Sequence, residues 1–124
     1  MKINSPERMA EIWIKSLELI AKDNLLDNIL YVDLCNEWTS FWSIMLRENE
    51  HNWAVPESLD WMKKSIEIVR YKYPDLPYTF SFDYTGNDMA EKFQKNPLPH
   101  FDLLEQHLWM ASLNNGEFNK TNHR

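Results

Sequence analysis

Apolar residues near the start of the chain recur at intervals of three and four, as on one face of a helix. The stripe consists of Ala10, Trp13, Ile14, Leu17, Ile20 and Ala21. It follows Ser5-Pro6-Glu7, where Ser is a good N-cap and Pro suits the first helical position because its missing N–H has no intrahelical partner to lose. The pattern therefore predicts an amphipathic helix as the first element.

The next apolar segment, residues 29–35, is too short and too evenly apolar for a surface helix. It predicts a strand buried on both faces. Side chains alternate along a strand, so one set would face a helix layer and the other set the interior. The two sets are Leu30, Val32 and Leu34, and Tyr31, Asp33, Cys35 and Glu37.

Residues 57–73 again carry apolar side chains at helical spacing. This stripe consists of Met62, Ile66, Val69 and Tyr73. Pro56 or Ser58 would begin the helix and Pro74 would end it. Residues 77–84 then alternate strictly and predict a second strand. Its aromatic set is Tyr78, Phe80, Phe82 and Tyr84, and its other set is Thr79, Ser81 and Asp83.

A short helix over residues 87–95 and a third strand over residues 101–109 complete the pattern. The order helix, strand, helix, strand, helix, strand predicts an α/β fold with three parallel strands joined by right-handed crossovers. We expect residues 1–113 to form this unit and residues 114–124 to form a polar tail.

The composition is that of one folded domain without a nucleic-acid or membrane partner. Hydrophobic residues make up 44% of the 124 residues, which is enough apolar surface to offset chain entropy. The net charge of −6 disfavours a phosphate-backbone partner. No segment approaches the ~20 apolar residues of a membrane helix, and the first residues lack a signal-peptide pattern. The single Cys35 lies in an apolar run and favours a reduced thiol and a cytoplasmic location.

Three predicted strand ends carry side chains suited to a sugar site. Ligands of parallel β/α folds bind at the carboxyl ends of the strands. The candidate site residues are Asn36, Glu37, Trp38, Asp83, His107 and Trp109. They combine carboxylates, an amide, an imidazole and aromatic rings.

Glu37 is the candidate catalytic residue, as a general acid and then a general base. The alternative is an exposed strand-end Glu. Asn36 would orient a sugar hydroxyl or else cap a turn. Trp38 is the residue expected to stack on a sugar. The alternative is that most of the aromatic residues of this segment bury a short helix under the loop, namely Trp38, Phe41, Trp42 and Trp53.

Other polar residues favour structural or contact roles. A buried Asp33 would be hydrogen-bonded, and Glu105 lies too deep in its strand for a nucleophile. His107 is expected in a core or substrate contact, because no His or Cys spacing makes a zinc or iron site. We therefore expect no metal and no cofactor.

Residues 30–38, Leu-Tyr-Val-Asp-Leu-Cys-Asn-Glu-Trp, resemble the fourth barrel strand of cellulase-like proteins in the clan of retaining β/α-barrel glycosidases. The resemblance covers about residues 10–112, with residues 79–83 and 101–109 similar to the fifth and sixth strands. It implies a partial TIM (β/α)8 barrel. It also implies that Glu37 is the acid/base, that Asn36 positions the substrate, and that His107 and Trp109 line the cleft.

The resemblance also indicates what is missing. The family's nucleophile is a Glu at the end of the seventh strand, but the resemblance ends with the sixth strand. Retaining hydrolysis needs two carboxyl groups ~5–5.5 Å apart, and only Glu37 is evident in this sequence. We therefore expect a fragment that binds a glycoside or oligosaccharide, shows no turnover alone, and self-associates through open sheet edges. The alternatives are an α/β carbohydrate- or protein-binding domain without catalysis, or a sugar-binding module that has lost hydrolysis.

Overall fold

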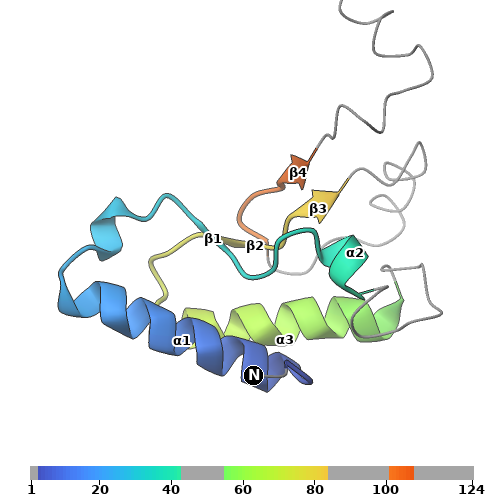
Figure 1. Cartoon of the computed structure of the whole chain (residues 1–124), viewed down its shortest axis with the longest axis horizontal. Coiled ribbons are helices and arrows are strands. Elements are labelled where there is room, and N and C mark those ends of the chain that lie inside the picture. The colour runs from blue at the N-terminus through green and yellow to red at the C-terminus, as the bar shows by residue number, and fades with distance from the viewer. Residues whose placement is uncertain (1–2, 43–54, 84–100, 108–124) are drawn as a thin grey trace, which may run out of the picture.

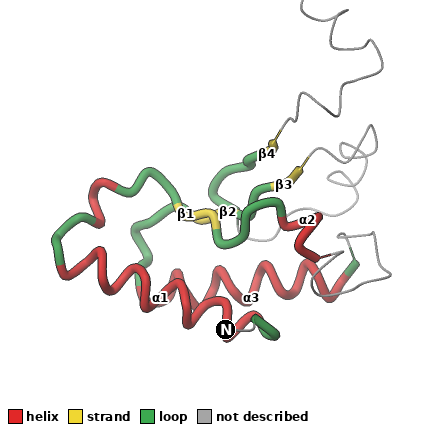
Figure 2. The backbone as a smooth tube through the Cα atoms, in the orientation of Figure 1, coloured by secondary structure: helices red, strands yellow, loops and turns green. Residues whose placement is uncertain are grey.

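The structure is a computed structural model that describes residues 3–42, 55–83 and 101–107 (Figure 1). In chain order the elements are α1 (Pro6–Lys22), the 3-10 helix η1 (Leu26–Asn28), β1 (Val32–Asp33), α2 (Trp38–Phe41), α3 (Pro56–Lys72), β2 (Tyr78–Thr79), β3 (Phe82–Asp83) and β4 (Gln106–His107). The long helices α1 and α3 lie side by side and form one layer, and the short strands lie on one side of that layer (Figures 1 and 2). The described chain is therefore an α/β structure.

Helix α1 begins and ends where local chemistry favours it. The Ser5 hydroxyl accepts a hydrogen bond from the Arg8 N–H at 3.1 Å, so the predicted N-cap is confirmed. Ala10 and Leu17 are almost fully buried against the strands and α3. Beyond the helix, Asn24 takes the left-handed conformation, with φ 56°, and the chain turns toward η1.

Helix α3 supplies the other half of the layer. It starts at Pro56 and ends at Lys72, two residues before Pro74, close to the predicted bounds. Met62, Ile66 and Val69 have no exposed surface, which confirms three of the four residues of the predicted stripe, while Tyr73 follows the helix and is partly buried. Together with the buried face of α1, these side chains form the core against which the strands pack.

The strands form two short parallel pairs. β1 pairs with β2, with Val32 opposite Tyr78, and β3 pairs with β4, with Phe82 opposite Gln106. Among the described residues the sheets thus have two strands each, whereas three continuous parallel strands were predicted. The predicted second strand is divided at Phe80 and Ser81, and the polar groups of Ser81 contact the turn after β1.

The predicted strand over residues 29–35 is longer than the observed one. β1 comprises Val32 and Asp33 alone, and the Leu30 side chain is 81% exposed, so Leu30 is not part of a face buried by helices. Val32 and Leu34 do lie in the core, as predicted. The Trp13 indole N–H donates to the Leu34 carbonyl at 2.8 Å, which ties α1 to the end of β1.

The predicted third strand is also shorter than expected. Among residues 101–107, only Gln106 and His107 are paired as a strand. The preceding residues join the chain near β2 through separate backbone and side-chain bonds. The Asp102 N–H donates to the Tyr78 carbonyl at 3.0 Å, the Asp102 carboxylate accepts from the Tyr78 N–H at 2.8 Å, and the Thr79 hydroxyl donates to the Leu103 carbonyl at 2.9 Å. Asp102 also forms a 2.6 Å ion pair with Arg70 of α3.

Several expectations fall outside the described residues. These are the helix over residues 87–95, the end of the third strand beyond His107, and the tail over residues 114–124. In the part of the chain that the structure describes, no helix is both long enough and apolar enough to span a bilayer.

Candidate functional site

The candidate acid Glu37 lies in the turn between β1 and α2. Its backbone is left-handed, with φ 52° and ψ 56°, and it is the N-cap residue of α2. Strand alternation was expected to aim Glu37 into the interior, but β1 ends at Asp33, so alternation does not reach it. The orientation of Glu37 depends on this turn instead.

Hydrogen bonds to Ser81, between β2 and β3, hold the turn. The Glu37 N–H donates to the Ser81 hydroxyl at 3.0 Å, and the Trp38 N–H donates to the Ser81 carbonyl at 2.8 Å. The Asp33 carboxylate accepts from the N–H groups of Cys35 at 3.1 Å and Ser81 at 3.0 Å. Asp33 is therefore a hydrogen-bonded structural residue, as expected from its place in the interior.

The Glu37 carboxylate contacts the imidazole of His107. Glu37 Oε1 lies 3.2 Å from His107 Nδ1, and Glu105 Oε1 lies 3.4 Å from His107 Nε2. The three side chains are 21%, 26% and 27% exposed, for Glu37, His107 and Glu105 respectively. An imidazole between two carboxylates thus lies at the end of β4, partly open to solvent.

These contacts change the proton affinity of the cluster. The hydrogen bond of His107 with the Glu37 carboxylate raises the pKa of His107 above its usual value, Glu105 adds to this, and burial acts in the opposite direction. A hydrogen bond to Glu105 also raises the pKa of the Tyr31 hydroxyl. A neutral imidazole has one N–H to donate, whereas an imidazolium has two and can serve both carboxylates. The arrangement therefore favours protonated His107.

The indole of Trp38 belongs to the core. Trp38 has no exposed surface, and its N–H donates to the Ser58 hydroxyl of α3 at 2.9 Å. Its ring packs edge-on against Phe80, with centroids 5.0 Å apart, and stacks with Phe41 at 5.8 Å. A ring buried on all sides cannot stack on a sugar, so the expected sugar contact of Trp38 is wrong, and the alternative of a buried short helix describes it.

The structure describes the other candidate site residues only in part. Asn36 is exposed beside Glu37, and its carbonyl is 3.7 Å from the Cys35 thiol. The backbone of Asp83 lies in β3 opposite His107, while its side chain lies outside the described residues, as does all of Trp109. The structure thus brings Glu37 and His107 together. The substrate contacts of Asn36, Asp83 and Trp109 stay predictions.

Two residues of the site were missed as site residues from the sequence. Ser81 was only one of the small side chains alternating with aromatic ones, and Tyr31 was only a member of the mixed face of a strand. A small hydroxyl residue on the face opposite four large aromatic residues does indicate a place where another segment of backbone approaches closely. That signal, however, does not say which segment approaches.

Neither a metal site nor a reactive thiol is evident in the described segments. Within residues 3–42, 55–83 and 101–107, no group of three or more His, Cys, Asp or Glu side chains is arranged to hold a metal ion. Burial, with a smaller effect of Asp33, raises the pKa of Cys35 to about 12. The thiol therefore stays protonated and is a poor nucleophile.

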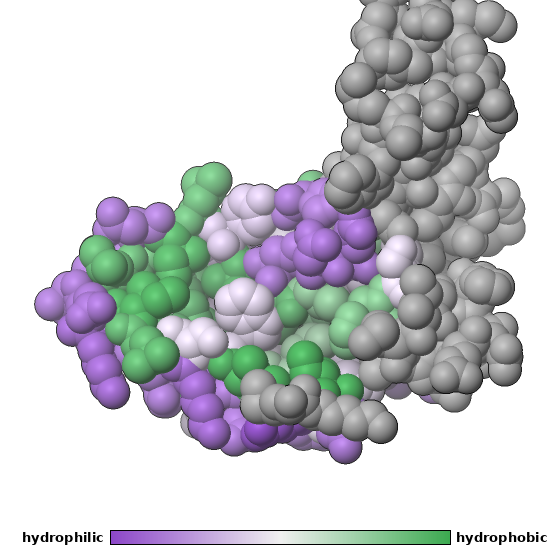
Figure 3. Space-filling model, in the orientation of Figure 1, coloured by the Kyte–Doolittle hydropathy of each residue, from purple (hydrophilic) through white to green (hydrophobic). Residues whose placement is uncertain are grey.

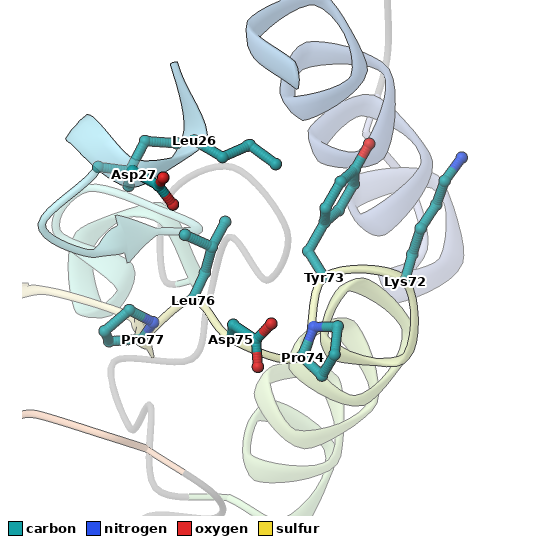
Figure 4. A pocket seen from close by; sticks show the side chains of 9 residues that line it. Leu26, Asp27, Lys72, Tyr73, Pro74, Asp75, Leu76 and Pro77 are labelled. Carbon is teal, nitrogen blue, oxygen red and sulfur yellow. The ribbon is translucent and has the colours of Figure 1, made fainter. Parts of the chain in front are cut away.

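A cavity of about 410 Å³ lies at the opposite end of the strands (Figure 4). Leu26 and Asp27 of η1 line it, together with Tyr73 and the segment 74–77 that leads into β2. Hydrophobic surface gathers at this η1 end of the molecule (Figure 3), where Leu25 and Leu30 are exposed. Because ligands of parallel β/α folds bind at the carboxyl ends of strands, we assign the candidate site to Glu37 and His107 rather than to this cavity.

Comparisons with known proteins identify the family of the chain. The family model described as "Cellulase-like: Sugar-binding cellulase-like" matches residues 1–123, and the chain belongs to this family. The chain is also similar to a candidate glycoside hydrolase of known crystal structure from Parabacteroides distasonis, with 42% identity and a TM-score of 0.74. That similarity covers 95% of this chain and 32% of the other, so this chain spans about a third of its length. No curated protein matches.

Proposed function

We propose that the chain contributes the proton-transferring half of a retaining glycoside hydrolase site, with Glu37 as general acid and then general base. The observation that carries this proposal is the 3.2 Å contact between Glu37 and His107. It joins the turn after β1 to the end of β4, at the strand ends where β/α enzymes bind substrate. Both side chains are about one quarter exposed, so a ligand can reach them.

The scaffold we propose is part of a TIM (β/α)8 barrel. Two parallel strand pairs flanked by two long helices are consistent with consecutive β/α units. The similarity to a glycoside hydrolase candidate about three times as long supports the same arrangement. A complete barrel has ~250 residues, so the remaining units would come from sequence beyond these 124 residues.

Within the described residues, Glu105 is the second carboxylate of the cluster, but it is unsuited to attack a sugar. Its Oε1 contacts His107, and its Oε2 is buried without a hydrogen-bond partner in this part of the chain. Retaining hydrolysis needs a nucleophile ~5–5.5 Å from the acid and open to the anomeric carbon. We therefore propose that Glu105 orients His107 and that the nucleophile lies elsewhere. The purified chain should not hydrolyse aryl glycosides.

The remaining substrate contacts follow from position. We propose that the exposed Asn36 amide binds a sugar hydroxyl beside Glu37 and that the exposed part of the His107 ring contacts the sugar. Asp83 and Trp109 stay in the proposal as cleft residues, because the Asp83 backbone is opposite His107 and Trp109 follows two positions later.

A hybrid protein tests the role of Glu37. This chain would replace the matching third of the Parabacteroides distasonis protein, and hydrolysis of aryl glycosides would be measured. General acid–base catalysis is worth ~10²–10⁴-fold, so Glu37→Gln should lower kcat/KM by about 100-fold or more. Glu18→Gln, on the exposed face of α1, is the matched control and should leave the rate unchanged. Equal rates for the Glu37→Gln hybrid and the parent hybrid would disprove the acid/base role.

A second candidate function is sugar binding without hydrolysis, which the family description favours. In that case the hybrid would bind oligosaccharides in calorimetry but would show no turnover with Glu37 present. If this chain alone binds oligosaccharides and the Asn36→Ala variant does not, the sugar-binding site includes the turn that contains Asn36.

We further propose that the isolated chain self-associates. Within the described residues β1 pairs only with β2, so its other edge has no strand partner there, and the nearby Leu30 is 81% exposed. Open edges of this kind pair with other chains. Light scattering should give a dimer or larger species, and a monodisperse monomer would contradict the proposal.

A further inference from the structure

The left-handed backbone at Glu37 needs a specific cause. Left-handed φ values place Cβ too close to the backbone carbonyl, and for residues other than Gly, Asn and Asp this conformation costs roughly 1–2 kcal/mol. Glu37 has φ 52° and is followed at once by the first residue of α2. Contacts outside the turn must therefore offset the strain.

Ser81 makes those contacts with every polar group that it has. Its hydroxyl accepts the Glu37 N–H and its carbonyl accepts the Trp38 N–H, so two successive peptide groups are bonded to one residue. Its own N–H donates to the Asp33 carboxylate. Ser81 has no exposed surface, so water does not compete for these bonds.

We propose that Ser81 is the positioning residue of the candidate site, holding Glu37 in the left-handed conformation from which its carboxylate reaches His107. The carbonyl and N–H of Ser81 would be present in any residue, whereas the bond to the Glu37 N–H needs the hydroxyl. Without it, a buried N–H would be left unpaired at a cost of about 1–3 kcal/mol. The turn would relax, and the carboxylate would move away from the imidazole.

The role of Ser81 in placing Glu37 goes beyond the proposed function. The placement of Glu37 does not depend on catalysis, and only its consequence for proton transfer rests on the proposed function. The measurement chosen is therefore the titration of His107, which reports the Glu37 contact whether or not the protein cleaves a sugar.

The experiment compares three variants of the whole chain by NMR titration of the His107 ring. Ser81→Ala should bring the pKa of His107 down toward the ordinary value of about 6.5, because the hydrogen bond of His107 to the Glu37 carboxylate is the main cause of the raised pKa. Ser81→Cys keeps the volume but is a weak acceptor, so it should behave like Ser81→Ala.

Ser65→Ala is the matched control. Ser65 is also fully buried, and its hydroxyl donates to the Trp61 carbonyl at 2.8 Å within α3. This variant should lose similar stability yet leave the His107 titration unchanged. An unchanged titration in Ser81→Ala, a wild-type titration in Ser81→Cys, or an equal shift in Ser65→Ala would each overturn the proposal.

A measurement on the unmodified chain covers the case in which Ser81→Ala does not fold. Hydrogen exchange should show the Glu37 amide protected as well as the Trp38 amide, since both donate to Ser81. Rapid exchange of the Glu37 amide beside a protected Trp38 amide would show that the hydroxyl does not hold the turn.

Discussion

Asn24 and Glu37 have nearly the same unusual backbone conformation, with φ 56° and φ 52°. Asn24 follows α1, where its N–H donates to the Ala21 carbonyl at 3.0 Å, and Asn is one of the few residues that tolerate this region. Glu37 precedes α2 and is not such a residue. At one position the residue suits the turn, and at the other the surroundings impose the turn on the residue.

The surroundings of the two turns differ accordingly. Leu25, after Asn24, is 48% exposed, whereas Trp38, after Glu37, is completely buried. The Asn24 turn is closed by bonds to its own helix, while the Glu37 turn is closed by Ser81, which is 44 residues away. Strain maintained by distant contacts is a frequent property of functional sites, and it supports assigning a function to Glu37.

The largest expected effect comes from the residue that follows each turn. Trp38→Ala should reduce the free energy of unfolding by about 3–5 kcal/mol, because it empties a fully buried aromatic site. Leu25→Ala should cost less than about 1 kcal/mol, since half of that side chain is already in water. Chemical denaturation of both variants checks this, and similar losses would remove the contrast between the turns.

Next in size is the loss of the Asp33 carboxylate. Asp33→Ala would leave the N–H groups of Cys35 and Ser81 without their acceptor, and it should cost about 2–3 kcal/mol. Asp33→Asn keeps an acceptor oxygen and should lose less than half as much. The stability of both variants is measured from the shift of the denaturation midpoint. An Asp33→Ala variant as stable as the parent would show that the Asp33 carboxylate does not stabilise the turn.

Glycine substitution at the two left-handed positions tests the strain itself. Glu37→Gly should raise the free energy of unfolding by about 1 kcal/mol, because Gly adopts this conformation without the Cβ clash. Asn24→Gly should change it by less than about 0.5 kcal/mol, since Asn is already tolerated there. Thermal denaturation would show the difference, and a destabilised Glu37→Gly protein would mean that the backbone is not strained.

The smallest effect concerns pH. The folded-state pKa of His107 is raised, so the stability it contributes is fully present below the unfolded value of about 6.5 and is lost as the pH rises through the higher folded value. The stability difference between the parent and His107→Gln should therefore be larger near pH 6 than near pH 9. For Asn24→Gly the same difference should not vary with pH. A pH-independent difference for His107→Gln would contradict the charge contact.

The helices were predictable because their signals are local. The Ser5 cap, the stripe of α1 and the proline bounds of α3 depend on residues within a few positions of one another. Strand lengths were overestimated, because a ladder needs a partner at each residue and not only an apolar run. Leu30 illustrates this, since it is apolar, lies in the predicted strand and is 81% exposed.

The proximity of Glu37 and His107 was predictable from the sequence, but the local geometry around them was not. Glu37 and His107 were placed at strand ends by position alone, and they do meet. The left-handed turn was not predictable, because Glu has no preference for it and its cause, Ser81, is distant in sequence. Trp38 was misjudged for a related reason, since an aromatic residue after a strand suits a cleft or a core equally well until its neighbours are known.

The position of His107 between two carboxylates has a consequence for charge. Imidazolium with two carboxylates carries a total of −1, and so does neutral imidazole with Glu37 protonated and Glu105 ionised. A proton can therefore move along the 3.2 Å contact from Nδ1 to Oε1 without altering the total, while Nε2 keeps its hydrogen toward Glu105. If Glu37 acts as the proposed acid, the hydrogen that it gives to a leaving group would be stored on the neighbouring ring rather than drawn from solvent.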